Sequence, residues 1–154
     1  MLLFLISCKN DDKVVTDKID FKQNQQEDIK IQKNISLDGD WEFIYNPNND
    51  DLPDIVFTLS IQKTNNNEFI AQYCAVAQKG NRIDCSNDKK FNVRGIIKGN
   101  KIEANFYSFF DNKKTKGNVE LTVLDNERIQ WEITKAPNSN FMRRKNVYLH
   151  KRKK

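Results

Sequence analysis

Residues able to do acid–base, nucleophilic or metal chemistry are few in this chain. Its 154 residues include one histidine, His150, and three cysteines, Cys8, Cys74 and Cys85. A catalytic base needs a nucleophile or substrate group within reach, and a zinc site needs several Cys or His ligands at short spacings. His150 lies among cations near the C-terminus, without such partners in the pattern. We therefore predict a protein that is not an enzyme and has no metal site and no cofactor.

Cys8 ends a short apolar run. Residues 1–7 are mostly apolar, and they are too few to span a bilayer, which takes about 20 residues. The segment Leu5-Ile6-Ser7-Cys8 resembles the bacterial lipobox, where a signal peptidase cuts before the cysteine and the new N-terminal cysteine carries acyl chains. The resemblance implies a lipoprotein signal peptide at residues 1–7 and a membrane partner held through the acyl chains on Cys8.

The same resemblance implies a location in the bacterial cell envelope, lipid-anchored to the outer membrane. Asp11-Asp12 resembles the signal that sends some Bacteroidota-type lipoproteins to the cell surface. Acidic residues also simply solubilise a tether, so periplasmic and surface orientations both stay open. No Lys or Arg precedes the apolar run, which leaves open a start codon upstream. The other interpretation is an ordinary apolar N-terminus with a buried Cys8.

Cys74 and Cys85 are separated by ten residues. In an oxidising envelope compartment such a pair is first interpreted as a disulfide. Closing so small a loop stabilises a fold by about 3 kcal/mol in the chain-entropy model. We expect this disulfide to be structural.

The positive charge is concentrated at the C-terminus. The net charge is +5, but residues 143–154 hold seven of the 26 basic residues and no acid, which leaves 19 basic against 21 acidic residues elsewhere. A nearly neutral body argues against a nucleic-acid partner. We interpret the cluster as a solvated basic tail, which near a membrane would attract anionic head groups by about 1 kcal/mol per cation.

The chain changes character near residue 35. Residues 8–34 are rich in Lys, Asp, Gln and Asn, and their apolar residues keep no period, which predicts a flexible lipid-anchored tether. A short helix around Gln23–Lys30 is the competing interpretation. From Ile35 the period becomes two, the mark of strands with one buried face. We therefore predict one domain over residues 35–154, including the basic tail.

Eight short strands are expected in this domain, joined by polar turns. Parallel pairing would need crossover connections that the chain lacks, so the strands should form an antiparallel meander. Closure into an up-and-down β-barrel would protect both edges, and a two-sheet sandwich is the alternative. The expected strands are Trp41–Tyr45, Ile55–Gln62, Phe69–Ala75, Phe91–Ile97, Ile102–Phe106, Val119–Val123, Ile129–Ile133 and Val147–Leu149, with Phe141 as an alternative start of the last strand.

The opening of the first strand, Leu37-Asp38-Gly39-Asp40-Trp41, resembles the Gly-x-Trp signature of the calycins, which include lipocalins, avidins and fatty-acid-binding proteins. The resemblance implies an eight-stranded, lipocalin- or avidin-like barrel whose closed end is plugged by Trp41. Many lipocalins place an arginine over this tryptophan, and Arg152 stands suitably late, within a run of basic residues. Only Asn46–Asp54 is available for the helical lid of fatty-acid-binding proteins, and Phe43 replaces a polar residue of avidins, which argues against biotin.

Aromatic residues share the inward-facing positions of the expected strands. They either fill the interior as plain core or line a cavity for one small apolar ligand, with Ala71, Ala75, Gly95 and Ala104 leaving room. On the cavity interpretation the protein binds a small, largely apolar ligand, with Tyr73 as the polar handle. The alternative is an envelope inhibitor or immunity-type protein that binds a protein partner through its rim, for example through residues 107–117. The candidate ligand-binding residues are Trp41, Phe43, Tyr73, Phe106 and Trp131.

Replacement of Cys8 by alanine tests the predicted anchor. Acyl chains on this cysteine would hold the protein stably at the membrane, because several chains give firm anchoring where one is marginal. We expect the wild-type protein to sediment with membranes and Cys8→Ala to move to the soluble fraction. A variant that stays in the membrane pellet would contradict acylation at Cys8.

Overall fold

The computed structural model describes residues 36–63, 67–138 and 144–153. Its contacts divide the chain into Met1–Asn34 and Ile35–Lys154, and the strands below all belong to the second unit. Cys8, the predicted tether and Phe141 lie outside the described residues. Among the residues described, no helix has the length and apolar character needed to cross a membrane.

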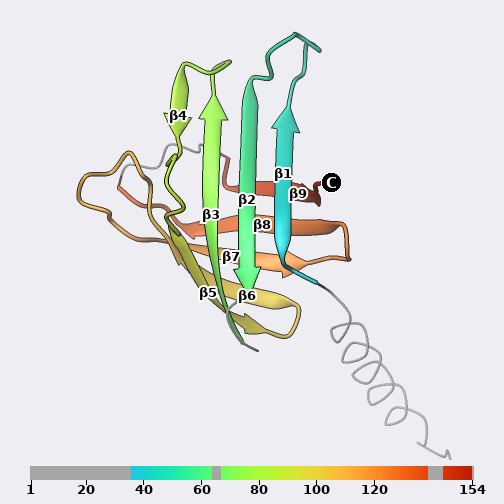
Figure 1. Ribbon diagram of the computed structural model, residues 1–154, viewed down its shortest axis with the longest axis vertical. Coiled ribbons are helices and arrows are strands. Elements are labelled where there is room, and N and C mark those ends of the chain that lie inside the picture. The colour runs from blue at the N-terminus through green and yellow to red at the C-terminus, as the bar shows by residue number, and fades with distance from the viewer. Residues whose placement is uncertain (1–35, 64–66, 139–143, 154) are drawn as a thin grey trace, which may run out of the picture. The chain divides into compact units, whose positions relative to one another are not determined.

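Nine strands form one antiparallel sheet (Figure 1). Their inward-facing positions alternate with exposed ones, as the burial pattern along the sixth strand shows most regularly. They are β1 (Gly39–Tyr45), β2 (Ile55–Lys63), β3 (Glu68–Ala77), β4 (Arg82–Asp84), β5 (Val93–Lys98), β6 (Lys101–Phe106), β7 (Gly117–Val123), β8 (Arg128–Lys135) and β9 (Asn146–Lys151).

Eight of these strands close into a barrel. The order runs β2-β1-β9-β8-β7-β6-β5-β3, and β3 pairs back onto β2 along Ile55–Lys63, so each of the eight has two neighbours. In Figure 1, β1 to β4 run side by side and cross the strands behind them at a steep angle. The predicted closed antiparallel barrel is confirmed, and the sandwich alternative is wrong because no sheet edge separates two layers.

The short strand β4 was not predicted from the sequence, where its residues form part of an expected loop. It pairs with the second half of β3, while the first half of β3 pairs with β5. Asn92 fills the gap where β3 changes partner: its side-chain oxygen accepts from the Tyr73 N–H at 3.0 Å, and its amide donates to the Tyr107 carbonyl at 3.0 Å. Phe91, expected in a strand, lies just outside β5.

A disulfide holds β4 against β3. Cys74 lies within β3, Cys85 follows the last residue of β4, and their Cα atoms are 4.4 Å apart. This distance lies at the short end of the usual range of about 4.4–6.8 Å. The predicted pairing of Cys74 with Cys85 agrees with the structure.

Trp41 closes one end of the barrel. Its ring is fully buried, and its indole N–H donates to the Leu37 carbonyl at 2.9 Å. The ammonium of Lys151 lies 5.0 Å from the ring centroid and donates to the Ser36 carbonyl at 2.7 Å. The cation over the tryptophan is therefore Lys151, whereas Arg152 forms an ion pair with Glu42 at 3.2 Å. Alternation along β9 explains the difference, because Lys151 follows Val147 and Leu149 on the inward face.

Removal of the disulfide should weaken the fold without changing it. The double variant Cys74→Ser/Cys85→Ser is expected to lose about 3 kcal/mol of unfolding free energy, because its unfolded chain is no longer cross-linked. Denaturant unfolding measures the change, and the wild-type protein under reducing conditions is the matched control. Equal stability of oxidised and reduced wild type would contradict a structural role, as would an intact mass showing two free thiols.

Candidate functional site

The middle of the barrel is filled by aromatic side chains. Trp131 lies against Phe57 and Phe106, with ring centroids 5.2 and 5.6 Å apart, and Tyr73 lies 6.0 Å from Phe106. All four side chains are buried. Edge-to-face contacts at these distances are the favourable arrangement for aromatic rings. Tyr73, Phe106 and Trp131, which the sequence suggested as ligand-binding residues, thus belong to the packed core.

Three of the four small residues, Ala71, Gly95 and Ala104, do not leave the room that the sequence suggested, whereas Ala75 lines the pocket described below. A side chain added at Gly95 would collide with the ring of Phe69 and with Ala104, because the Phe69 ring already occupies that space. Ala71 and Ala104 are likewise buried inside the core. The expectation of space beside Gly95 is wrong for a packing reason: a glycine can make room for a neighbouring ring instead of for a ligand.

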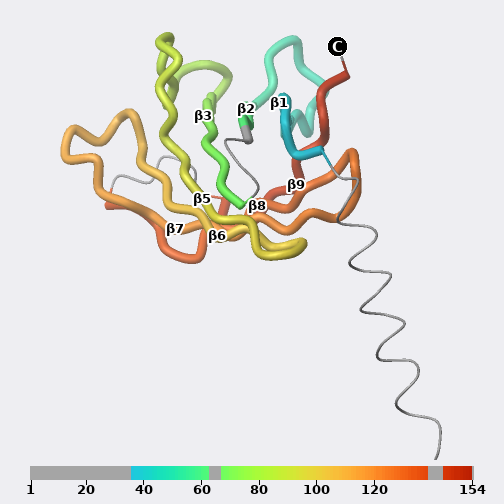
Figure 2. Tube along the Cα trace, turned by 60° about the horizontal axis from the view of Figure 1, so that its bottom comes forward, coloured from blue at the N-terminus to red at the C-terminus, as the bar shows by residue number. Residues whose placement is uncertain are grey.

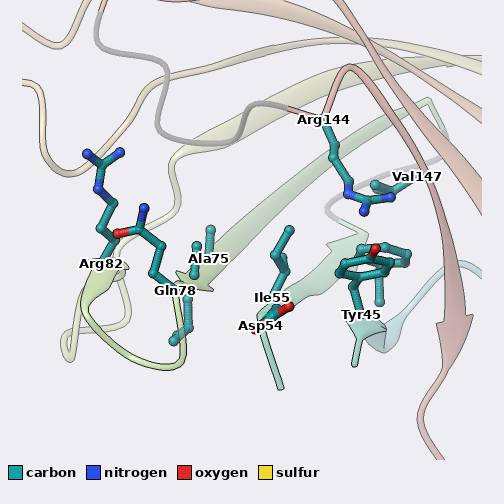
Figure 3. Close-up of a pocket in the computed structure, with 11 residues that line it drawn as sticks. Tyr45, Asp54, Ile55, Ala75, Gln78, Arg82, Arg144 and Val147 are labelled. Carbon is teal, nitrogen blue, oxygen red and sulfur yellow. The ribbon is translucent and has the colours of Figure 1, made fainter. Parts of the chain in front are cut away.

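A pocket of about 400 Å³ lies at the open end of the barrel, and Figure 3 shows the side chains that line it. It is made by the ends of β1, β2, β3, β4 and β9 and by residues just outside them. Of the predicted ligand-binding residues, Phe43 lines it, while Trp41 lies at the closed end. The lining residues are Phe43, Tyr45, Asp54, Ile55, Ala75, Val76, Ala77, Gln78, Arg82, Arg144 and Val147.

The pocket follows from the way β1 and β9 separate. Their paired residues are limited to Trp41 with Lys151 and Glu42 with His150, near the closed end. Beyond these pairs, Phe43 and Tyr45 on β1 and Val147 on β9 have no partner in the β1–β9 ladder, and all three line the pocket. The open seam between the first and last strands therefore supplies the space that the filled core does not.

Arg144 covers this seam. Its guanidinium carbon lies 4.0 Å from the Tyr45 ring centroid and 5.7 Å from that of Phe43, and Figure 3 shows it above Tyr45. The next residue is tied to β8, because the Ile133 N–H donates to the Lys145 carbonyl at 2.7 Å. A guanidinium stacked on rings keeps the N–H groups at its edge available to an acceptor. Arg144 can thus present hydrogen-bond donors at the pocket wall.

The other side of the pocket is polar and carries both signs of charge. Gln78, Arg82 and Asp54 line it. Nearby Lys79 forms an ion pair with Asp50, and this hydrogen bond, followed by the charges of Asp50 and Asp54, raises the pKa of the lysine. The carboxylate of Asp54 lowers the positive potential of the pocket, so a ligand with one acceptor group fits better than a polyanion.

A buried carboxylate lies close to the pocket. Asp84 is 2% exposed, and one oxygen accepts hydrogen bonds from the Tyr73 and Ser108 hydroxyls, both at 2.7 Å. The other oxygen accepts from the backbone N–H groups of Phe109 at 2.8 Å and Phe110 at 3.3 Å. These donors satisfy a charge that would otherwise be costly to bury. Asp84 thereby joins β3, β4 and the chain after β6.

The Tyr73 hydroxyl is committed to this network. Burial raises the pKa of the phenol far above its usual value, and the charge of Asp84 raises it further. Tyr73 therefore remains a neutral donor throughout the neutral pH range and acts neither as a base nor as a nucleophile. It is a structural partner of Asp84, not the polar handle for a ligand that the sequence suggested.

The indole N–H of Trp131 is buried and has no hydrogen-bond partner within the described part of the chain. Trp131 is opposite Val147 in the β8–β9 ladder, and Val147 lines the pocket. An unpaired buried donor is a cost to the fold unless an acceptor reaches it. Trp131 itself is not among the residues that line the pocket.

Residues 36–63, 67–138 and 144–153 were considered for metal-binding groups and for partners of the histidine. No three His, Cys, Asp or Glu side chains in these ranges gather closely enough to hold a metal ion. His150 lies on the exposed face of β9, opposite Glu42 and Arg128 in its two ladders.

Asp84 and Arg144 are the residues of this region that sequence reasoning missed. Asp84 directly precedes a half-cystine, and an acid beside a disulfide-linked strand is a signal that could have been followed. Arg144 stands in a basic run, where nothing in the pattern separates it from Lys145. Searches against models of protein families, curated proteins and solved structures found no match to this chain.

Replacement of Asp84 by asparagine should destabilise the open end of the barrel. The amide keeps the size of the side chain but turns one acceptor into a donor facing other donors, so we expect a loss of about 3 kcal/mol in unfolding free energy. Chemical denaturation measures it. Asp88→Asn, at an exposed ion pair with Lys90, is the matched control and should leave the unfolding free energy nearly unchanged. Equal effects of the two substitutions would contradict the role given to Asp84.

Proposed function

We propose that this protein is a non-catalytic binding protein of the bacterial cell envelope that holds one small, largely apolar molecule in the barrel mouth. The observation that carries the proposal is the pocket of about 400 Å³ above the aromatic core. Ligand pockets usually measure about 300–1,000 Å³, are mostly apolar and contain a few convergent polar groups. This pocket has that size and that kind of lining.

The filled core limits how deep a ligand can go. Phe57, Trp131 and Phe106 are in contact below the pocket, so the ligand must lie at the mouth and across the seam between β1 and β9. Its apolar body would contact Ile55, Ala75 and Val147. Burial of apolar surface there stabilises the complex by roughly 25 cal/mol per Å² removed from water, before the cost of association.

The polar end of the ligand would meet Arg144. The guanidinium is the positively charged group stacked on the aromatic wall, and it favours a carboxylate or another planar acceptor. A ligand with an apolar body and one acidic head group therefore fits the pocket. The predicted acyl anchor on Cys8 would keep such a binding protein at the outer membrane, where small amphiphilic molecules are present.

The alternative function is an envelope inhibitor or immunity-type protein that binds a protein through the barrel rim. The loop between β6 and β7 favours it, because this loop is ordered and exposes Phe110. The two functions predict different outcomes for small-molecule binding. Saturable binding in the pocket supports the first, and its absence supports the second.

Titration with an environment-sensitive fluorescent fatty acid tests the proposed function. We expect saturable binding to the wild-type protein and at least about tenfold weaker binding to Ala77→Trp, because the indole would occupy the pocket. Ile44→Trp adds the same side chain at an exposed position outside the lining and should bind like the wild type. Arg144→Gln should weaken the binding of a fatty acid more than the binding of the alcohol of equal chain length. Absence of saturable binding to the wild type would overturn the proposal.

A further inference from the structure

The β6–β7 loop, residues 107–116, presents an exposed aromatic side chain. Phe110 is 71% exposed, more than any other large hydrophobic side chain in the described ranges. Figures 1 and 2, which differ by a rotation, both show this loop, in orange, extending away from the strands. Single exposed hydrophobic side chains are common on protein surfaces, so the significance of Phe110 depends on the loop that carries it and on the charges of that loop.

The loop is held in place by hydrogen bonds to two carboxylates. Asp84 accepts from the backbone N–H groups of Phe109 and Phe110. Asp111 accepts from the N–H groups of Lys113 at 2.9 Å and Thr115 at 2.8 Å, and also from the Thr115 hydroxyl. The backbone of the loop at Phe110 is therefore already fixed, and little backbone order has to be gained when a partner binds.

Three lysines follow the exposed ring along the same loop. Lys113, Lys114 and Lys116 are exposed, and none of them forms an ion pair with a carboxylate in the part of the chain that the structure describes. The ammonium of Lys114 lies 5.4 Å from the Tyr107 ring centroid. The acid within the loop, Asp111, is engaged by the loop's own backbone. The loop thus carries three exposed cations within six residues of its exposed phenylalanine.

We propose that this loop docks on an anionic lipid surface, with Phe110 at the level of the acyl chains and the three lysines at the phosphate groups. An aromatic ring flanked by lysines matches the boundary between head groups and hydrocarbon. A protein partner fits less well, since a stable interface takes about 800 Å² from each side and some 20 or more residues. One side chain and three cations are too few for that.

Docking would also orient the barrel mouth. The Phe109 ring lies 6.2 Å from the Tyr73 ring, and Tyr73 is two residues before Ala75, which lines the pocket. The loop and the pocket therefore share one end of the barrel, and lipid contact through Phe110 turns the pocket toward the bilayer. The docking does not depend on the pocket holding a ligand, so each proposal can fail alone.

The expected affinity of the loop for an anionic membrane is modest. Each lysine near an anionic surface contributes roughly a fivefold gain in partitioning, so three lysines give about a hundredfold preference for anionic over neutral vesicles. This loop would therefore orient a protein already held near the membrane, as the predicted anchor at Cys8 would do.

Vesicle flotation of the full chain tests the proposal, with Cys8→Ala as the parent so that acylation plays no part. We expect binding to vesicles of phosphatidylglycerol and phosphatidylethanolamine, and much weaker binding to phosphatidylcholine. Phe110→Ser should lower binding about tenfold, and Lys113→Gln/Lys114→Gln/Lys116→Gln by about a hundredfold. Leu52→Ser, which removes a 60% exposed leucine from another loop, is the matched control and should bind like the parent.

Fluorescence identifies the segment that makes contact. In Phe110→Trp the new indole is exposed whereas Trp41 and Trp131 are buried, so anionic vesicles should shift its emission to the blue. Binding without this shift would overturn the proposal, as would equal binding to neutral vesicles or no effect of the Phe110 and lysine substitutions. Phe110-dependent capture of a protein, with no vesicle binding, would assign the loop to a protein partner instead.

Discussion

The buried carboxylate of Asp84 is the interaction on which the open end of this barrel depends. It accepts hydrogen bonds from Tyr73 in the core and from Ser108 and Phe109 in the β6–β7 loop. A charge in such a place is tolerated only when its oxygens are satisfied, and the segments that donate to it are fixed in return. The disulfide at the next residue holds the same strand to β3. Covalent and electrostatic constraints therefore act on one short element.

Because the interior of the barrel is packed, a ligand could bind only at the rim. Aromatic rings occupy the middle of the barrel, and an eight-stranded barrel is just narrow enough for side chains to fill it. Space remains where β1 and β9 part, beyond the pair of Glu42 with His150. Arg144 lies over that opening on the ring of Tyr45. The pocket and the β6–β7 loop thus share the end of the barrel at which β1 and β9 are not paired.

Much of the strand pattern was predictable, because alternation of apolar and polar residues is a direct consequence of the pleated backbone. The eight expected strands correspond to the eight strands of the barrel. The ninth strand, β4, has three residues, which are too few to show an alternation. It pairs with the part of β3 beyond Ala71, where the pairing of β3 with β5 has ended. The candidate site was harder to predict. Period two says that Phe43 and Trp131 face inward, but not that one borders a pocket and the other is packed among rings.

The amino-acid sequence by itself determined which residues face inward and which cysteines could pair, although the first strand begins at Gly39, two residues before the predicted start. Only the tertiary structure decided that Lys151 covers Trp41, that Phe69 takes the space beside Gly95, and that Asp84 meets donors more than 20 residues away. Those outcomes depend on strand register and on the summed volumes of side chains brought together by closure. Whether an inward-facing position borders empty space is therefore a property of the whole barrel.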